Sequence, residues 1–380
     1  MKTIMLAIGL ALAATAAHAD TWKCGRTYQD HRCHVMHKHD GKVKTVATPK
    51  TPQPVPSTGT STPPPVASVP TPAPTPKPSP TPATPPPVAT APAATPAGCQ
   101  RPYSVASIWN TPIAANTTYS SQSDYNITAL RGTFGSDPNQ YTMPVYEVDN
   151  STPLVKVNLS GSFSDVTDNG AKLTKTKGLM QIPIPATAQA ATGGDSQIII
   201  WNRETGDEWG FWKAAPSADG SWTVTNGYHY NTHWSGVPPK SFGSRGAGVP
   251  YLTGLIRRCE IEQGRIEHAI AFAYDVPTSQ FVYPATKSDG TGAGPDMPEG
   301  AQLQLDPTLT DQQIEAWGCK AACLVIAHAL QDYGMIIIDK AGHPKIYAEY
   351  EGTAHWNGVI VAKTVSTIPY SAFKVLPYHP

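Results

Sequence analysis

The side chains best suited to chemistry gather at the start of a stretch that runs from Tyr228 to Tyr274. This group combines possible proton donors and acceptors with rings that can stack on sugars, and it consists of Tyr228, His229, Tyr230, His233 and Trp234. Because Asn226-Gly227 precedes the group and Pro238-Pro239 follows it, we expect a loop that presents these rings to a ligand. The alternative is a loop whose rings fold back onto the edge of the domain.

A long strand is predicted over Arg265–Tyr274, where bulky and small side chains alternate. Period-two alternation places His268 on the face of the bulky residues and Glu267 on a face of alanines. The bulky face is expected to lie in the core, which makes His268 a hydrogen-bonded core histidine. With the two faces exchanged, His268 lies in a cleft. Glu267 is a candidate catalytic residue because the alanines around it leave room for a ligand.

Two reactions on polysaccharides fit these residue types. Glycoside hydrolysis needs two carboxyl groups, with one pKa raised, and elimination next to a uronate needs a Tyr or His base and a cation. The predicted catalytic residues are Glu208, His233, Glu267 and His268. The predicted substrate-binding residues are Tyr228, His229, Tyr230, Trp234, Arg245 and Trp212. No spacing within these sets is diagnostic, and a surface position is the alternative for each glutamate.

A glycine-rich segment, Lys287–Gly300, holds three acidic residues, Asp289, Asp296 and Glu299. Carboxylates on such a loop suit calcium, although the spacing fits no EF-hand and a plain hairpin loop is the alternative. No other cofactor is predicted for the main domain. The histidine-rich segment near the N-terminus offers imidazoles to a borderline metal, or forms a cationic patch.

Several enzyme classes are disfavoured by missing motifs and by charge. The sequence has no HExxH, no GxxxxGK[ST], no GxGxxG after a strand and no GxSxG, which argues against zinc proteases, NTPases, nicotinamide enzymes and typical serine esterases. Residues 99–380 carry 19 Lys and Arg against 25 Asp and Glu. Nucleic acid is therefore an unsuitable partner, because phosphate binding needs clustered cations. We expect a monomer that binds a polysaccharide or a cell-envelope glycan.

The fold is predicted to be mainly β, a β-sandwich of jelly-roll type with one buried helix at about 319–333. Short alternating segments indicate strands, among them Leu154–Leu159, and Ser196–Asn202 with Glu208–Lys213 indicates a hairpin. Thr310 and Gln313 form a capping box before the helix, and Gly334 can end it.

Four regions follow one another along the chain. Residues 1–19 have the charged start, short apolar run and small-residue ending of a signal peptide, so secretion is expected. Residues 20–47 form a small basic, histidine-rich module, and residues 48–98 form a Pro/Thr-rich linker. Residues 99–380 form the main β-rich domain. No later segment is apolar enough to predict a membrane span.

The six cysteines are expected to form disulfides after export. Cys24 and Cys33 can staple the small module. The remaining cysteines, Cys99, Cys259, Cys319 and Cys323, allow three pairings. We favour Cys319–Cys323 with Cys99–Cys259, on the assumption that Gly318 delays the start of the helix and leaves Cys319 in the preceding turn.

The main domain resembles a group of secreted bacterial proteins of unassigned function. The resemblance lies in the stretches IWNTPI, GDEWGFW, SRGAGVPYLTGLIR, GRIEHAIAF, YPATKSDG, ALQDYGMIIID and IPYSAFKVL. The segment TWKCGRTYQDHRC resembles a small cysteine module of proteobacterial periplasmic proteins. Neither resemblance implies an activity. The residues predict a secreted polysaccharide-cleaving enzyme, with a glycoside hydrolase preferred; a lyase with a Tyr/His base and a non-catalytic glycan-binding protein are the alternatives.

Overall fold

The computed structural model describes residues 99–160, 180–239 and 245–378, together with the backbone of four short strands elsewhere. Two of these, β1 (Lys23–Cys24) and β2 (Thr27–Tyr28), pair in antiparallel fashion in the small module. The predicted signal peptide, the linker and Cys33 lie outside the described residues. The chain divides into two compact units, Met1–Pro86 and Pro87–Pro380, and the second contains the main domain.

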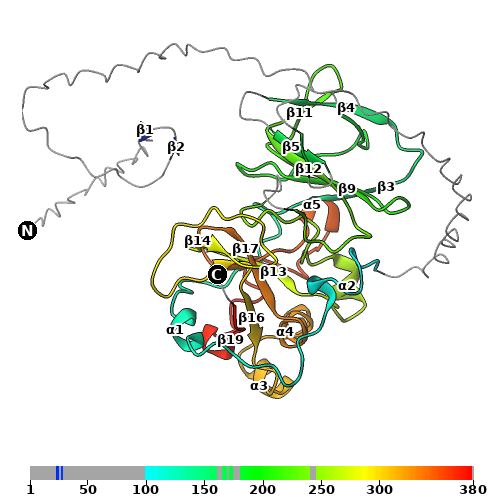
Figure 1. Cartoon of the computed structure of the whole chain (residues 1–380). Helices are drawn as coiled ribbons and strands as arrows, with labels where there is room; N and C mark the ends of the chain where they lie inside the picture. The colour runs from blue at the N-terminus through cyan, green and yellow to red at the C-terminus, as the bar shows by residue number, and fades with distance from the viewer. Residues whose placement is uncertain are drawn as a thin grey trace, which may run out of the picture. The chain divides into compact units, whose positions relative to one another are not determined.

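Three sheets of the main domain are stacked (Figure 1). The outer sheet has the order β10 (Ala215–Pro216), β11 (Trp222–Val224), β4 (Leu154–Leu159) and β7 (Met180–Pro183). The middle sheet has the order β3 (Val145–Val148), β8 (Ile198–Asn202), β9 (Asp207–Trp212), β12 (Asn226–Asn231), β5 (Asp165–Asp168) and β6 (Ala171–Leu173).

The third sheet has the order β18 (Lys345–Ile346), β13 (Ile270–Tyr274), β17 (Met335–Lys340), β16 (Gln302–Leu305) and β19 (Phe373–Val375). Beside it, β14 (Thr278–Phe281) and β15 (Pro298–Glu299) form a parallel pair. The short helices are η1 (Ile108–Asn110), α1 (Ser123–Ile127), α2 (Arg258–Glu262), α3 (Asp311–Ala316), α5 (Glu351–Ala354) and η2 (Tyr370–Ala372).

Three apolar cores hold these layers together. Alternate residues of β8 enter different cores: Ile198 and Ile200 face the outer sheet, whereas Ile199 and Trp201 face the third sheet. A strand buried on both faces explains the unbroken apolar run in the sequence. The mainly β fold is therefore confirmed, and the packed sheets are consistent with a β-sandwich. Several neighbouring strands run parallel, for example β3 with β8 and β13 with β17, which the sequence pattern did not indicate.

The predicted buried helix is α4 (Ala322–Asp332), which packs in the core below the third sheet. Its start is later than predicted, because the Thr310–Gln313 capping box begins the separate short helix α3. Gly318, with φ of 88°, makes the turn between them. Gly334 donates its N–H to the Ala329 carbonyl and ends α4 as expected.

Both predicted disulfides of the main domain are confirmed. Cys99 joins Cys259 across 160 residues, and Cys319 joins Cys323 across four. Cys319 lies in the turn before α4, which relieves the awkward spacing within a helix. The predicted Cys24–Cys33 disulfide falls outside the described residues. Over the part of the chain that the structure describes, no helix has the length and apolar character needed to cross a membrane.

Candidate functional site

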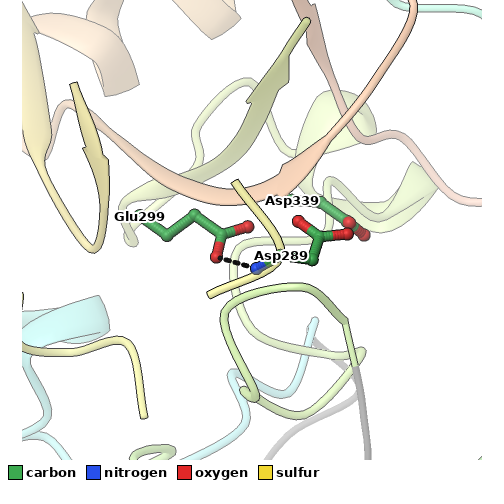
Figure 2. A group of neighbouring side chains, drawn as sticks. All are labelled: Asp289, Glu299 and Asp339. Carbon is green, nitrogen blue, oxygen red and sulfur yellow. Dashed lines mark hydrogen bonds between the residues drawn. The ribbon is translucent and has the colours of Figure 1, made fainter. Parts of the chain in front are cut away.

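Three carboxyl groups, those of Asp289, Glu299 and Asp339, meet beside the third sheet (Figure 2). One oxygen from each lies within 4.8 Å of the others. Asp289 is exposed, Asp339 is half-buried and Glu299 is fully buried. The only hydrogen bond drawn among the three joins the Asp289 N–H to Glu299 Oε2, at 3.2 Å. We call this group the carboxylate centre.

Backbone contacts fix the three segments that carry the carboxylate centre. Glu299 lies in β15, and its carbonyl accepts the Val282 N–H at 2.9 Å. The next residue, Gly300, donates its N–H to Ile337 of β17 at 2.7 Å. The pairing of β13 with β17 shifts register after Phe272, so that Asp339 lies opposite Ala273. Such bulges redirect side chains at the ends of strands, and this one places Asp339 near the end of β17.

Gly246 leaves open the space between two of the carboxylates. A Cβ atom at this position would lie 2.4 Å from Glu299 Oε1 and 2.6 Å from Asp289 Oδ1. The Gly246 N–H points to Asp339 Oδ1 at 3.3 Å. Glycine therefore lets the backbone approach all three side chains, in a way that any other residue would obstruct.

Burial and mutual repulsion govern the protonation of the carboxylate centre. Burial, followed by the charges of Asp289 and Asp339, raises the pKa of Glu299 to about 9. Burial, followed by the charge of Asp289, raises the pKa of Asp339 to about 7, against the lowering effect of Arg245. Glu299 thus keeps its proton at neutral pH, whereas Asp339 titrates close to neutrality.

Two buried cations lie near the carboxylate centre. Arg245 donates Nη2 to the Tyr251 carbonyl at 2.7 Å, and its guanidinium carbon lies 4.6 Å from the centre of the Tyr347 ring. Lys345 Nζ lies 4.8 Å from the same ring centre, and burial lowers its pKa to about 8. These positive charges partly offset the three acids, so that Asp339 is influenced by both negative and positive neighbours.

The carboxylate centre could also hold a metal ion. Glu299 Oε1 is buried and has no hydrogen-bond partner among the described residues, which is unfavourable unless a cation or proton satisfies it. The predicted calcium residues Asp289 and Glu299 belong to the group, but Asp296 does not. Asp339 takes its place, while Asp296 Oδ2 accepts the Ala293 N–H at 2.8 Å within the loop.

Glu208, a predicted catalytic residue, is fully buried in the middle sheet. Tyr103 donates to its Oε2 at 2.6 Å, Leu252 N–H donates to its Oε1 at 3.1 Å, and the Tyr228 hydroxyl also donates to Oε1. Burial raises the pKa of Glu208, against the effect of these hydrogen bonds. The structure places Glu208 in a closed network that joins β9, β12 and the segment before α2.

The predicted aromatic loop is partly strand, because Tyr228, His229 and Tyr230 lie in β12. Tyr228 and Tyr230 point into the core between the middle and third sheets. His229 points the other way, stacks on Trp209 at 5.0 Å and pairs with Asp207 at 2.9 Å. The Asn-Gly pair that suggested a turn instead begins β12, where the chain passes from β11 in the outer sheet to the middle sheet.

The remaining members of the aromatic group lie after β12. His233 is exposed, and its N–H is held by Asn231 Oδ1 at 2.9 Å. Trp234 is 44% exposed, with its ring edge-on to Tyr230 at 5.2 Å. Trp212 is half-buried at the end of β9, where its Nε1 donates to Asp195 at 3.0 Å.

His268 is a buried histidine that precedes β13 and forms an ion pair with Glu260. Its Nε2 lies 2.9 Å from Glu260 Oε1, and its Nδ1 lies 2.9 Å from the Ala269 carbonyl oxygen. Both ring nitrogens face acceptors, which favours the doubly protonated ring. The charge of Glu260 raises the pKa of His268, although burial acts in the opposite direction.

Glu267 does not share a cleft with the alanines of β13. The strand begins at Ile270, after Glu267, whose half-exposed side chain pairs with Arg265 at 3.0 Å. The alanine face, Ala269, Ala271 and Ala273, is buried against the middle sheet. The predicted alternation is therefore present, but both faces are core.

A separate polar pocket of about 800 Å³ lies beside the Cys99–Cys259 disulfide. Arg257 joins two of its acids, with Nε at 2.7 Å from Glu349 and Nη2 at 3.0 Å from Glu147. The arginines lower the pKa of Glu147 despite its burial. Both acids are paired with Arg257, which disfavours either of them as a proton donor.

Two important positions were missed from sequence. Asp339 closes the apolar run Ile336–Ile338, and a single acid after a buried strand was the available signal. Gly246 lies in the Gly-rich segment that follows Arg245. Comparison with family models, curated proteins and solved structures gives no match to this chain.

Proposed function

We propose that the protein is a secreted glycoside hydrolase that works at the carboxylate centre. One observation carries this proposal: an exposed carboxylate, Asp289, lies within 4.8 Å of the half-buried Asp339. Retaining glycosidases hold two carboxyl groups about 5–5.5 Å apart, whereas inverting enzymes need about 6.5–9.5 Å for a water molecule. With 4.8 Å as the upper limit between the two oxygens, the arrangement is closer to the retaining than to the inverting geometry, which supports hydrolysis with retention of configuration.

The roles follow from exposure and charge. Asp289 attacks the anomeric carbon as the carboxylate, while Asp339 donates its proton to the glycosidic oxygen as the C–O bond breaks. A water molecule then cleaves the glycosyl–Asp289 ester and returns a proton to Asp339. Glu299 is a positioning residue, because it is buried and accepts the Asp289 N–H. The pKa of Asp339, about 7, suits a group that alternates between acid and base.

A lyase that uses the predicted tyrosine bases has less support. Tyr228 and Tyr230 are buried, and Tyr228 is already hydrogen-bonded to Glu208 and to the Tyr251 N–H. Burial raises the pKa of Tyr228 well above its ordinary range, which opposes a basic phenolate.

A second candidate function is calcium-dependent glycan binding without cleavage. The buried, unpartnered Glu299 Oε1 and the open space at Gly246 support an ion shared by Asp289, Glu299 and Asp339. Carboxylate oxygens are suitable calcium ligands at 2.3–2.6 Å, so oxygens up to 4.8 Å apart fit around one ion.

Product analysis on a panel of polysaccharides tests the proposal. We expect new reducing ends without the ultraviolet absorbance of an unsaturated uronate, and NMR should show the retained anomer first. Asp289→Asn and Asp339→Asn should each lower kcat by about 10²–10⁴-fold. Asp296→Asn is the matched control, since Asp296 lies in the same loop outside the centre, and it should keep activity.

The alternative outcomes are distinct. Unsaturated products would indicate a lyase and would overturn hydrolysis. Activity that both Asp→Asn variants retain would show that the reaction occurs elsewhere. Glycan retention that EDTA abolishes, with no cleavage at any pH, would favour the calcium-dependent binding protein.

A further inference from the structure

Two exposed aromatic side chains flank the core around Tyr230, and one of them follows the strand that pairs with Glu299. Trp234 is 44% exposed and Tyr283 is 64% exposed. Both adjoin the core around the buried Tyr230. The Trp234 ring packs edge-on to Tyr230 at 5.2 Å, and Tyr283 lies between Phe281 and Ala285, which pack in the same core cluster as Tyr230. Trp234 and Tyr283, supported by Tyr230, are called the aromatic platform below.

The aromatic platform adjoins the carboxylate centre through the backbone. Tyr283 follows Val282, whose N–H is bonded to the Glu299 carbonyl at 2.9 Å. Three residues later, the Thr286 N–H is bonded to the Ala247 carbonyl at 2.8 Å, one residue beyond Gly246. The segment that carries Tyr283 therefore runs along both Glu299 and the Gly246 turn.

Both rings stand on anchored backbone. The Trp234 carbonyl accepts the Ser104 N–H at 2.9 Å, and the Trp234 N–H is bonded to the Asn231 carbonyl at 3.1 Å. On the other side, the Ala285 N–H is bonded to the Val282 carbonyl at 2.8 Å. Large rings held on fixed backbone can bind a flat apolar surface with little loss of conformational entropy.

We propose that Trp234 and Tyr283 bind the sugar rings of an uncharged polysaccharide whose chain continues to the carboxylate centre. The C–H faces of pyranose rings provide the apolar surface that an aromatic ring covers. Neither ring carries a charge at neutral pH, and residues 99–380 carry more acidic than basic residues, 25 against 19, which disfavours a polyanion. Glycan binding by the platform stands independently, while its role as a subsite for cleavage rests on the proposed function.

Binding to defined polymers tests the aromatic platform. The full chain with Asp289→Asn, which keeps the polymer intact, is titrated by affinity electrophoresis against a β-glucan, a xylan, a mannan and polygalacturonate. We expect retention by at least one uncharged polymer and none by polygalacturonate. Adding Trp234→Ala or Tyr283→Ala should weaken that binding by about tenfold, a loss of one stacked ring. Tyr283→Phe should restore it.

Tyr125→Ala provides the matched control, because Tyr125 is 52% exposed on α1. It should bind as the parent does. Unchanged binding in both Trp234→Ala and Tyr283→Ala would overturn the proposal, and so would retention by polygalacturonate alone or by none of the four polymers. Thermal melts of each variant establish that the fold is kept.

The two proposals fail separately. Binding that depends on both rings, without any cleavage by the unmodified chain, supports the platform and contradicts the hydrolase. Cleavage of a polymer with KM unaffected by either ring variant supports the hydrolase and contradicts the platform. In the chain with Asp289 intact, we expect KM for the polymer to rise about tenfold in each variant, with little change in kcat.

Discussion

At the residue scale, the carboxylate centre depends on a glycine as much as on its acids. Gly246 occupies the position where a side chain would contact Glu299 and Asp289. Its backbone N–H also faces Asp339. A single methyl group at this position would therefore displace the Glu299 and Asp289 carboxylates.

Gly246→Ala should abolish activity while the protein remains folded. The added Cβ has to displace Glu299 Oε1 and Asp289 Oδ1, which lie closer than van der Waals contact allows. We expect at least a 100-fold loss of kcat/KM, measured on the polymer that the parent cleaves. Gly342→Ala, at a position where a Cβ would meet open space, is the control. Normal kcat/KM in Gly246→Ala would contradict the assigned geometry.

The raised pKa of Glu299 should make the free energy of unfolding depend on pH. Its pKa is about 9 in the folded protein and has an ordinary value near 4.5 when unfolded. The folded state therefore binds the proton more tightly, so this contribution is complete below about pH 4.5 and is lost as pH rises through about 9. Glu299→Gln, which cannot ionise, should melt at least about 2 °C above the parent at pH 8.5.

Scanning calorimetry in EDTA measures the difference in melting temperature between Glu299→Gln and the parent, and this difference should be smaller at pH 5 than at pH 8.5. An equal difference in melting temperature at the two pH values would contradict a raised pKa of Glu299. Calcium provides a further comparison: an ion bound at the centre would stabilise the parent at pH 8.5 and leave Glu299→Gln less affected.

Sequence reasoning recovered part of the centre. Asp289 and Glu299 were found because a glycine-rich loop with acids is a local signal. Asp339 comes from a distant strand, and its position depends on a register shift between β13 and β17. No local pattern reports such a shift, so Asp296, the nearer acid, was chosen in its place.

At the element scale, periodicity predicted strands better than it predicted their surroundings. Leu154–Leu159 matches β4, and the hairpin of β8 and β9 was predicted to within two residues. The two faces of β13 were also assigned correctly, with large residues in one core and alanines in another. What failed was the inference that a small-residue face is open, because a second sheet covers it.

The two disulfides should differ strongly in their contributions. Cys99–Cys259 closes 160 residues, whereas Cys319–Cys323 closes four. In the chain-entropy model, the longer loop constrains the unfolded state more, by about 3 kcal/mol. Urea unfolding of Cys99→Ser/Cys259→Ser and of Cys319→Ser/Cys323→Ser measures the contrast. An equal loss in the free energy of unfolding in both double variants would contradict the entropic explanation.

At the scale of the whole molecule, the layers place polar networks between sheets. Glu208 with Tyr103 and Tyr228 joins strands of the middle sheet to the segment before α2. Such closed networks explain why residue type alone does not identify a catalytic glutamate in this chain. A glutamate beside tyrosines contains the same residue types whether it is structural or catalytic. The burial of Glu208 is what distinguishes it from a catalytic glutamate in an open site.

The Cys99–Cys259 bond also determines how the main domain responds to mechanical force. The segment before residue 99 joins the main domain at Cys99. A force applied between that segment and the C-terminus is therefore transmitted through the disulfide to Cys259 on α2. The segment from 260 to 380 can be drawn out at about 3.6 Å per residue, except for the short loop that Cys319–Cys323 closes. The loop from 99 to 259, which carries the outer and middle sheets, bears no tension until the disulfide is reduced.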